Sequence, residues 1–401
     1  MKVMVVVGAR PNLMKAAPML WAMKKTPSME SVLVHTGQHY DQALDGIFFQ
    51  ELELPPPDYH LGVGSGSHAY QTAQVMVKLE DLLKKITPDW LVVVGDINST
   101  LAAALTAAKL LIPLAHVESG LRSFDRTMPE EVNRIVTDSL ANLLFVTEKS
   151  GVDNLRQEGL TEFLNAGEPI FQVEDDILAP VCGLGQNSKS VRLGAFVGNV
   201  MIDTLLRFRE RASQEAQKSL PDRDFALLTL HRPSNVDHPI ILQRILEAIN
   251  EVSQDLPVIF PCHPRTRLRL REYQLENYCR PIHLPFTAIP SQGVLLLEPL
   301  GYIDFLNFMT RASLVLTDSG GVQEETTILE VPCITLRENT ERPVTVTEGT
   351  NILVGVNPDS IVQGARAALN GQRKTSCRPV LWDGRAAQRI IQILEATHAY
   401  G

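Results

Sequence analysis

The stretch DWLVVVGDINSTLAAALTAAKLLIPLAHVES, residues 89–119, decides the fold. A valine-rich apolar run at its start is followed by an alanine-rich helical run at 99–111 and by a second apolar run at 113–119. Buried parallel strands have such continuous apolar runs, and a helix is their usual connection. The stretch therefore predicts a strand, a helix and a parallel strand, which is the repeating unit of an α/β domain.

The same alternation continues on both sides of this unit. In the first half we expect further strands in KVMVVVGAR (2–10), SVLVHTG (31–37) and LLFVTE (143–148), and a helix in PEEVNRIVTDSLAN (129–142). In the second half we expect strands in FALLTLH (225–231), PVIFPC (257–262), GVLLLEPL (293–300), SLVLTDS (313–319) and CITLRE (333–338), and a helix in HPIILQRILEAINEVSQ (238–254). We therefore predict an α/β protein with two Rossmann-like domains facing a central cleft.

The chain is long enough for these two domains. With 401 residues, of which 44% are hydrophobic, it can bury two ordinary cores. We place the first domain at residues 1–198 and the second at 199–380, and we expect a helix at 383–398 to pack back on the first. The segment 160–193 is interrupted by Gly, Pro, Asn and Ser, so we interpret it as a connection with an insertion.

Composition and charge exclude several classes of protein. A net charge of -9 leaves no basic surplus for sequence-independent nucleic-acid binding. No apolar run reaches the ~20 residues that span a bilayer. A Gly and a Pro interrupt the N-terminal run before a signal-peptide core is complete, so we expect a cytoplasmic protein without membrane association. The five cysteines lack CxxC spacing, which indicates buried free thiols rather than a disulfide framework or a metal site.

Candidate ligand-binding residues follow the predicted strands, because ligands of doubly wound sheets bind outside the carboxyl ends of the strands. No strand end has the GxGxxG spacing, so we predict no dinucleotide cofactor. Arg10 and Lys15 follow the first strand at the start of a helix, where they suit an anionic ligand. Alternatively, Pro11 begins that helix and both cations are solvated.

Three acids and a histidine stand at other strand ends or helix starts. Asp96, Glu118 and Glu130 would each suit a helix cap if taken alone. Three acids that converge on one edge suit acid–base chemistry, because crowding and burial separate their pKa values. His231 ends a strand of the second half, where a structural hydrogen-bonding role competes with a catalytic one.

The stretch LTDSGGVQEE, residues 316–325, indicates an anion site. Ser319, Gly320 and Gly321 offer backbone N–H groups and a hydroxyl to a phosphate at a helix N-terminus. The alternative is an ordinary N-cap followed by acids in the first helical turn. Further polar residues near strand ends of this half are His263, Arg265, Arg337 and Arg342.

Six segments together resemble the signatures of the UDP-N-acetylglucosamine 2-epimerase family, chiefly its non-hydrolysing bacterial and archaeal type. They are GARPNLMKAAP (8–18), TGQHYDQ (36–42), GDINST to RIVTD (95–138), HRPSNVD (231–237), PCHPRTR (261–267) and LTDSGG to EGTN (316–351). They span nearly the whole chain, and the two long segments are far more specific than any three-residue motif. The resemblance implies a fold of the glycosyltransferase-B kind.

The resemblance also implies an activity, the reversible conversion of UDP-N-acetylglucosamine to UDP-N-acetylmannosamine. Loss of the C2 proton and cleavage of the anomeric C–O bond give UDP and 2-acetamidoglucal, which recombine with the proton on the opposite face of C2. Inversion requires acid–base groups on both faces, and the sequence leaves open which acid serves which face. The resemblance further implies no cofactor, a homodimer, a supply of sugars for cell-surface polysaccharide, and in some members a second UDP-N-acetylglucosamine bound as activator.

Site residues are carried over from the family by position. The catalytic residues are Asp96, Glu118, Glu130 and His231. The residues that bind substrate or UDP are Arg10, Lys15, Phe305 near the uracil, Ser319, Gly320 and Gly321 at the pyrophosphate, Glu325 on the ribose hydroxyls, and Arg342. Further candidates for substrate or regulatory contacts are Gln38, His39, Arg122, Glu131, Arg232 and His263.

Some positions depart from the family pattern, and alternative functions stay open. Ala9 stands where Thr is common, Asn12 where Glu is common and Ser234 where Glu is frequent, which bears on positioning or regulation. One alternative is a hydrolysing epimerase that releases N-acetylmannosamine and UDP. Another is a glycosyltransferase with the same fold and UDP site, and a third is a non-catalytic nucleotide-sugar sensor. Diacetamido or otherwise modified UDP-sugars are alternative substrates.

Overall fold

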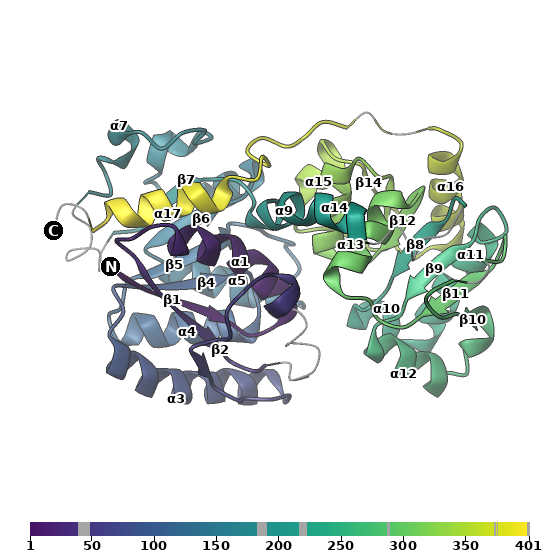
Figure 1. Ribbon diagram of the computed structural model, residues 1–401, viewed down its shortest axis with the longest axis horizontal. Helices are drawn as coiled ribbons and strands as arrows, with labels where there is room; N and C mark the ends of the chain where they lie inside the picture. Colours follow the sequence, from purple (N-terminus) through teal and green to yellow (C-terminus); the bar gives the residue numbers. More distant parts are fainter. Residues whose placement is uncertain are drawn as a thin grey trace. The chain divides into compact units, whose positions relative to one another are not determined.

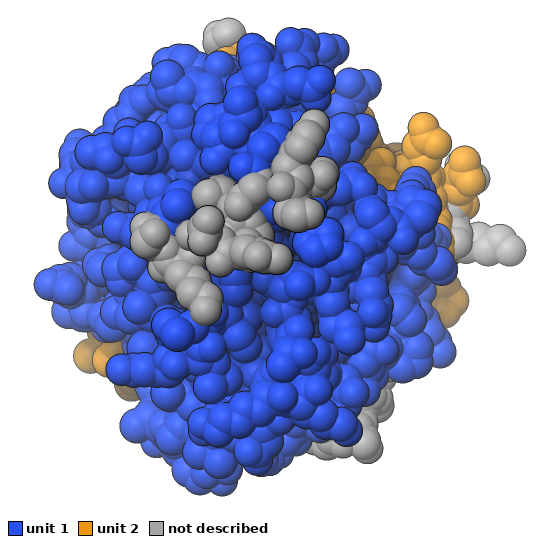
Figure 2. All heavy atoms as spheres, turned by 90° about the vertical axis from the view of Figure 1, so that its left-hand side faces the viewer, with its two compact units in different colours: residues 1–204, 380–401 blue, residues 205–379 orange. Residues whose placement is uncertain are grey.

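The computed structural model describes residues 1–38, 49–182, 191–215, 223–286, 289–372, 374 and 376–398. The chain forms two compact units, shown in different colours in Figure 2. Unit 1 comprises Met1–Thr204 and Val380–Gly401, and unit 2 comprises Leu205–Pro379. Each unit has its own parallel sheet with helices on its faces (Figure 1). The α/β class predicted from the sequence is therefore confirmed.

Unit 1 contains a parallel sheet of seven described strands in the order β3-β2-β1-β4-β5-β6-β7. The strands are β1 (Lys2–Val7), β2 (Glu30–His35), β3 (Tyr59–His60), β4 (Trp90–Val94), β5 (Leu114–Ser119), β6 (Leu143–Val146) and β7 (Leu193–Phe196). The helices are α1 (Arg10–Lys24), α3 (His68–Ile86), α4 (Asn98–Lys109), α5 (Pro129–Leu140), α6 (Lys149–Gln157), the 3-10 helix η1 (Leu164–Gly167), α7 (Asp175–Leu178) and α17 (Ala386–Ala396). Helix α9 (Val200–Glu215) begins in unit 1 and continues into unit 2.

Unit 2 repeats this plan with the strand order β10-β11-β9-β8-β12-β13-β14, again parallel among the described strands. The strands are β8 (Ala226–Thr229), β9 (Val258–Pro261), β10 (Cys279–Pro281), β11 (Val294–Leu297), β12 (Leu314–Thr317), β13 (Cys333–Thr335) and β14 (Asn351–Leu353). The helices are α10 (Pro233–Val236), α11 (Pro239–Val252), α12 (Pro264–Glu272), η3 (Glu276–Tyr278), α13 (Tyr302–Arg311), α14 (Gly320–Leu329), α15 (Pro343–Thr347) and α16 (Pro358–Leu369).

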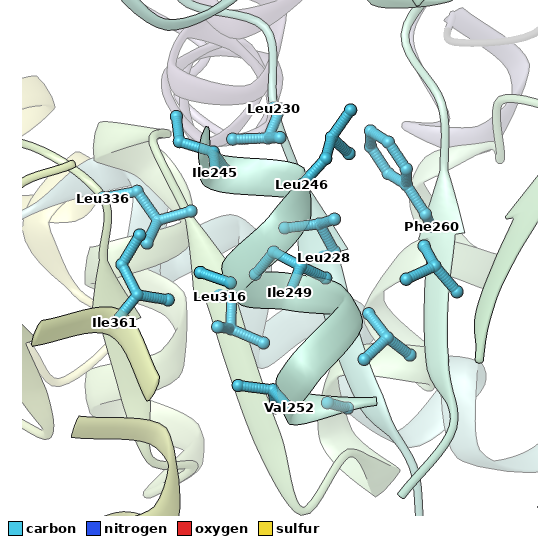
Figure 3. Close-up of a cluster of buried hydrophobic side chains, with 14 of the residues drawn as sticks. Leu228, Leu230, Ile245, Leu246, Ile249, Val252, Phe260, Leu316, Leu336 and Ile361 are labelled. Carbon is cyan, nitrogen blue, oxygen red and sulfur yellow. The ribbon is translucent and has the colours of Figure 1, made fainter. Parts of the chain in front are cut away.

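Burial of amphipathic helices on the sheets holds each unit together. In unit 2, Ile245, Ile249 and Val252 repeat along one face of α11 at helical spacing and are fully buried. They belong to one cluster with Leu228 of β8 and Leu316 of β12 (Figure 3). Each such side chain contributes about 1.5–3 kcal/mol on burial, so the cluster fixes the sheet that carries the strand-end residues.

Ten predicted strands are observed, and four observed strands had not been predicted. The unpredicted strands β3, β10 and β14 have two or three residues each, too short for a sequence pattern. Strand β7 lies at the end of the segment that was interpreted as a connection. It contains Gly194, and a side chain there would come within 2.3 Å of the Phe163 ring, so packing requires a residue of low strand propensity.

The C-terminal helix belongs to unit 1. Helix α17 contacts α1, and its N-terminus is capped by Asp203, which accepts hydrogen bonds from the N–H groups of Ala386 and Ala387 at 3.2 and 2.8 Å. The indole of Trp382 donates to the carbonyl of Thr147 at 3.1 Å. These contacts join the last residues of the chain to the end of β6.

Each sheet has one place where the strand order reverses. In unit 1 this place is between β1 and β4, which pair from Val3 opposite Trp90 to Val6 opposite Val93. In unit 2 it is between β8 and β12. Ligands of open α/β sheets bind outside the carboxyl ends of strands at such switch points. The loops after β1, β4, β8 and β12 are therefore the positions for functional residues.

Two further expectations concern membranes and cysteines. None of the described helices is both long and apolar enough to cross a membrane. All five cysteines lie within the described residues and are free. Cys262, Cys279 and Cys333 are buried, and burial raises the pKa of each thiol to about 12. Cys377 is exposed, so the expectation of buried thiols was wrong at that position.

Candidate active site

Adjacent strands of unit 1 leave the sheet through backbone in the left-handed region. Glu118 has φ of 73°, and Gly95 and Gly120 have φ of 67° and 81°. For a residue other than glycine such a conformation costs about 1–3 kcal/mol and is often found at functional sites. The register of β5 against β6 also shifts between Val117 and Ser119, which redirects the side chain between them. The strain thus falls on one of the predicted catalytic acids.

Glu118 is paired with a buried cation. Its Oε2 accepts a hydrogen bond from Nζ of Lys15, and the two side chains are 3% and 10% exposed. The alternative of a solvated cation is therefore wrong for Lys15. A side chain at Gly95 would come within 3.1 Å of this Oε2 and 3.5 Å of the Lys15 Nζ, so the loop after β4 requires glycine here. Arg10, the first residue of α1, is half-buried.

Asp96 is held by a second buried cation. Oδ2 of Asp96 forms an ion pair with Nη1 of Arg134 in α5, and Nη2 of Arg134 lies 2.8 Å from Oε2 of Glu131. Glu131 also accepts hydrogen bonds from the N–H groups of Ser123 and Phe124 at 2.9 and 3.0 Å. Burial would raise the pKa of Glu131, but these N–H groups and Arg134 hold it below its ordinary value. The Glu131 carboxylate therefore binds the loop at Ser123 and Phe124 and the guanidinium of Arg134.

Glu130 differs from these two acids. It lies in the first turn of α5 and is half-buried. Its side chain forms no hydrogen bond or ion pair with another residue of the part of the chain that the structure describes. The first turn of a helix favours a carboxylate. Of the three predicted acids, Glu130 is therefore the one whose carboxyl faces no cation among the described residues.

A buried His–Asp pair joins the loops that carry Asp96 and Glu118. Nδ1 of His116 lies 2.6 Å from Oδ1 of Asp138, and Nε2 lies 2.9 Å from the carbonyl oxygen of Gly95. Oδ2 of Asp138 accepts from the N–H of Gly120 at 3.0 Å and from Arg122 at 2.7 Å. Burial would raise the pKa of Asp138, but the positive charges of His116 and Arg122 hold it below its ordinary value.

Of three other sequence candidates in the first half of the chain, two bind neighbouring protein groups and one lies outside the described residues. Oε1 of Gln38 accepts hydrogen bonds from the N–H and Oγ of Ser99, at 3.0 and 2.7 Å, and so joins the end of β2 to α4. Arg122 forms two hydrogen bonds of 2.7 Å with the carboxylate of Glu158 in addition to its contact with Asp138. His39 lies outside the described residues.

In unit 2, the predicted catalytic histidine is oriented by a buried carboxylate. Nδ1 of His231 lies 2.9 Å from Oδ1 of Asp318, which is completely buried, while the imidazole is 43% exposed. Asp318 also accepts from the backbone N–H of Arg232 at 3.0 Å. Burial would raise the pKa of Asp318, but His231 and these N–H groups hold it below its ordinary value. A carboxylate at Nδ1 leaves Nε2 to exchange protons with a ligand.

The N-terminus of α14 lies against a guanidinium group. A side chain at Gly320 would lie 2.6 Å from Nη1 of Arg342 and 2.9 Å from Oε1 of Glu341, so glycine allows this approach. Ser319 occupies the N-cap position but makes no side-chain capping bond, and no acid lies in the first turn that Gly320 and Gly321 open. The alternative of an ordinary cap is therefore wrong. A helix N-terminus beside a cation suits an anionic ligand.

Arg342 belongs to a buried cluster of charges. Its Nε pairs with Glu324 at 2.5 Å and its Nη1 with Glu341 at 2.6 Å. Glu341 also pairs with Arg337 at 2.7 Å and with Arg232 at 3.2 Å. Burial would raise the pKa of Glu341, but the three arginines hold it well below its ordinary value. Three guanidinium groups face two carboxylates, so the cluster retains a positive charge for a ligand.

Glu325 is a buried acid of a different kind. Burial raises its pKa to about 8, with a further contribution from the neighbouring charge of Glu324, although the hydroxyl of Tyr302 opposes the shift. That hydroxyl donates to Oε1 of Glu325 at 3.1 Å. Phe305 follows Tyr302 by three residues on α13 and is half-buried. A carboxylate without a cation partner suits hydroxyl donors of a ligand.

Comparison with known proteins identifies the family. The family model for UDP-N-acetylglucosamine 2-epimerase matches residues 21–395. The chain is 41% identical over 397 residues to UDP-N-acetylglucosamine 2-epimerase of Methanocaldococcus jannaschii, covering 98% of this chain and 99% of the relative. The chain belongs to the UDP-N-acetylglucosamine 2-epimerase family.

A solved structure and one further relative extend this comparison. The fold is similar, with a TM-score of 0.82 and 39% identity, to the crystal structure of the M. jannaschii UDP-GlcNAc 2-epimerase in complex with UDP-GlcNAc and UDP. That comparison covers 98% of this chain and 99% of the other. The chain is also 37% identical to UDP-2,3-diacetamido-2,3-dideoxy-D-glucuronate 2-epimerase of Pseudomonas aeruginosa, covering 98% of this chain and 99% of the relative.

In this epimerase family member, two positions of the HRPSNVD and PCHPRTR segments lie beside His231. Arg232 donates from Nε to the carbonyl of Asp318 at 3.1 Å and so supports the same loop. His263 is exposed at the N-cap of α12, where its Nδ1 accepts from the N–H of Arg265 at 3.2 Å. The His263 and His231 rings have centroids 6.2 Å apart. His263 therefore lies beside the ring of His231, and its Nδ1 hydrogen bond is to Arg265 rather than to Asp318.

Proposed function

We propose that this epimerase family member interconverts UDP-N-acetylglucosamine and UDP-N-acetylmannosamine without net hydrolysis. The observation that carries the proposal is the state of the three acids in unit 1. Asp96 and Glu118 each face a buried cation, whereas Glu130 faces none among the described residues. The names of relatives that cover nearly the whole chain support the same reaction.

The chemistry requires an elimination, because the C2 proton is weakly acidic until the anomeric C–O bond is breaking. The electron pair of the C2–H bond forms the C1–C2 double bond, and the C–O electron pair leaves with UDP. The products are 2-acetamidoglucal and UDP, and the reverse steps place the proton on the other face of C2. The transition state gains positive charge on the sugar and negative charge on the departing phosphate, so groups of both signs are needed.

We assign different roles to the three acids. The carboxylates of Asp96 and Glu118, which face Arg134 and Lys15, stabilise positive charge on the sugar. Glu130 acts on one face of C2, and one of the other two acids acts on the opposite face. In the elimination, the acid on the face of the C2 proton accepts that proton. When UDP adds back, the acid on the opposite face gives its own proton to C2, and the reverse reaction uses the same two acids in the opposite order.

Residues of unit 2 hold the leaving group in this proposal. The hydroxyl of Ser319, the N–H groups of Gly320 and Gly321 and the guanidinium of Arg342 bind the pyrophosphate. The N–H of Ser319 itself donates to the hydroxyl of Thr317. His231, oriented by Asp318, donates a hydrogen bond from Nε2 to the phosphate oxygen that carries the developing charge. Arg10 and Lys15 of unit 1 contribute positive charge to the same substrate.

Glu325 and Phe305 recognise the uridine in this proposal. The carboxyl of Glu325 accepts hydrogen bonds from the ribose hydroxyls, and the Phe305 ring lies near the uracil. We also infer that the protein acts as a cytoplasmic homodimer that supplies N-acetylmannosamine-type sugars for polysaccharide. A second UDP-N-acetylglucosamine is its proposed activator.

An isotope experiment tests the reaction. Incubation with UDP-N-acetylglucosamine in D2O is expected to introduce deuterium at C2 of both epimers, as seen by NMR, with no net rise in free UDP. Recovery of substrate without deuterium contradicts the epimerase proposal. Stoichiometric accumulation of UDP and free N-acetylmannosamine identifies the hydrolysing type. Exchange that requires an added acceptor sugar identifies a glycosyltransferase.

The P. aeruginosa relative favours one second candidate for the substrate, a diacetamido uronic acid linked to UDP. The chemistry at C2 is the same for both sugars, so the proposed roles of the acids do not change. Parallel D2O incubations with the two nucleotide sugars decide between them through their ratio of kcat/KM. A ratio of at least about tenfold, or 1.4 kcal/mol of transition-state binding, identifies the preferred substrate.

A further inference from the structure

We infer that the buried His116–Asp138 pair is a positioning device that sets the spacing of the two ion-paired acids, Asp96 and Glu118. The inference rests on the proposed function, because those acids must act on one sugar. His116 and Asp138 touch no substrate in this proposal. They act through backbone groups of the two loops in which the acids stand.

The two side chains are fully enclosed and fully hydrogen-bonded. His116 is 0% and Asp138 is 1% exposed. Both ring nitrogens of His116 face acceptors, the Asp138 carboxylate at 2.6 Å and the Gly95 carbonyl at 2.9 Å. A ring that donates from both nitrogens carries a positive charge, which the carboxylate balances. A buried ion pair with complete hydrogen bonding is directional and rigid.

The contacts of the pair lie at residues within two positions of the acids. Through Nε2, His116 holds the carbonyl of Gly95, the residue before Asp96. Through Oδ2, Asp138 holds the N–H of Gly120, two residues after Glu118. One ion pair therefore connects the end of β4 to the end of β5 beyond the last ladder hydrogen bonds.

The backbone at these contacts needs such support, since its conformation is not the preferred one. Glu118 is in the left-handed region, and a side chain at Gly120 would lie 2.4 Å from the carbonyl oxygen of Gly151. Strained positions persist where the surroundings over-determine them. Arg122 adds a third bond to the Asp138 carboxylate, at 2.7 Å, and so fixes a later position of the same loop.

Loss of the pair should lower kcat more than it lowers the affinity for UDP, which an ordinary stabilising contact would not do. The UDP-binding residues proposed above lie mainly in unit 2, so displacement of the loops after β4 and β5 leaves UDP binding intact. A displacement of about 1 Å at reacting groups can lower the rate about 100-fold. The expected signature is therefore a fall in kcat with little change in the affinity for UDP.

The test uses Asp138→Asn and His116→Phe in the full chain. For each we expect kcat to fall about 30- to 100-fold, with the Kd of UDP within about twofold of the unsubstituted protein. We also expect release of 2-acetamidoglucal and UDP into solution, because displaced acids no longer support the re-addition step as well as the elimination. The double variant should lose no more than the worse single variant, since the two residues act as one unit.

A matched control separates positioning from stability. Asp383→Asn removes a carboxylate that pairs with buried Arg389 in the same unit, distant in sequence from the acid-bearing loops. We expect a similar fall in Tm but an unchanged kcat per folded molecule. Equal losses of kcat in Asp138→Asn and Asp383→Asn overturn the inference, as does normal kcat in Asp138→Asn. Absence of deuterium exchange in the unsubstituted protein overturns the proposed function itself.

Discussion

Acidic side chains in the two units have different kinds of partner. In unit 1, the acids Asp96 and Glu118 each have a buried cation as partner, Arg134 and Lys15. In unit 2, the buried acid Glu325 has a tyrosine hydroxyl and no cation among its interactions with the described residues. Carboxylates that face cations suit a sugar that becomes positive, whereas a carboxyl without a cation suits neutral hydroxyls. This chain thus combines two kinds of acid on two copies of one sheet plan.

The largest expected effect follows from removal of the charged acids in unit 1. Asp96→Asn and Glu118→Gln should each lower kcat by about 10²–10⁴, because a positioned acid or base contributes that much to proton transfer. The Kd of UDP should change by less than about twofold, since the proposed UDP-binding acid lies in unit 2. Steady-state kinetics and calorimetry measure both quantities. As a control, Glu80→Gln replaces an exposed acid of α3 and should leave kcat unchanged.

A second prediction concerns stability and follows from the Lys15–Glu118 ion pair. Lys15→Met removes the cation that the buried Glu118 faces, so we expect the free energy of unfolding to fall by about 3–5 kcal/mol. Addition of Glu118→Gln should recover most of that loss, because the charge is then gone, while kcat stays low. Urea unfolding measures the stability. If the double variant is less stable than Lys15→Met alone, the ion pair is not what stabilises this loop.

How far the sequence predicts this arrangement depends on the range of the interactions. Short apolar runs predict ten of the observed strands, and chain position places Asp96, Glu118 and His231 at strand ends, since both are local properties. The partners that set their charge were not predicted. Asp318 orients His231 from 87 residues away, and His116 meets Asp138 only because β5 and α5 pack together. Strand β7 was missed because Gly194 is required by the Phe163 ring, a contact invisible in the local pattern.

A third prediction uses the titration of Glu325. Its pKa of about 8 in the folded protein lies above that of an ordinary carboxyl, so the folded state binds an additional proton between about pH 4.5 and 8. Stability of the ligand-free protein therefore falls as pH rises through that window. Glu325→Gln should remove this fall. Thermal unfolding at a series of pH values, for the unsubstituted protein and the variant, measures the difference.

The same titration affects ligand binding with the opposite sign. Ribose hydroxyls donate to an ionised carboxylate, so the affinity for UDP should rise as pH approaches 8. Titration of the UDP phosphates affects the unsubstituted protein and Glu325→Gln equally. The difference between their profiles of UDP affinity against pH therefore reports the ionisation of the Glu325 carboxyl. We expect Glu325→Gln to weaken UDP binding by about tenfold at pH 8, which is 1.4 kcal/mol. Unchanged affinity with a large loss of kcat would contradict the proposed role.

The smallest expected effect is that of Tyr302→Phe. The hydroxyl of Tyr302 donates to Glu325 and lowers its pKa, against burial and the charge of Glu324. Its removal should therefore move the pH dependence of UDP binding to higher pH. The affinity at pH 7 should weaken by about threefold, because a net hydrogen bond contributes about 1 kcal/mol and ribose replaces part of it. At pH values well above the titration the variant and the unsubstituted protein should converge, since both carboxyls are then ionised. A constant loss of affinity at every pH would instead make Tyr302 a direct ligand contact, and the comparison between the ion-paired acids of unit 1 and the hydroxyl-held acid of unit 2 would lose its physical basis.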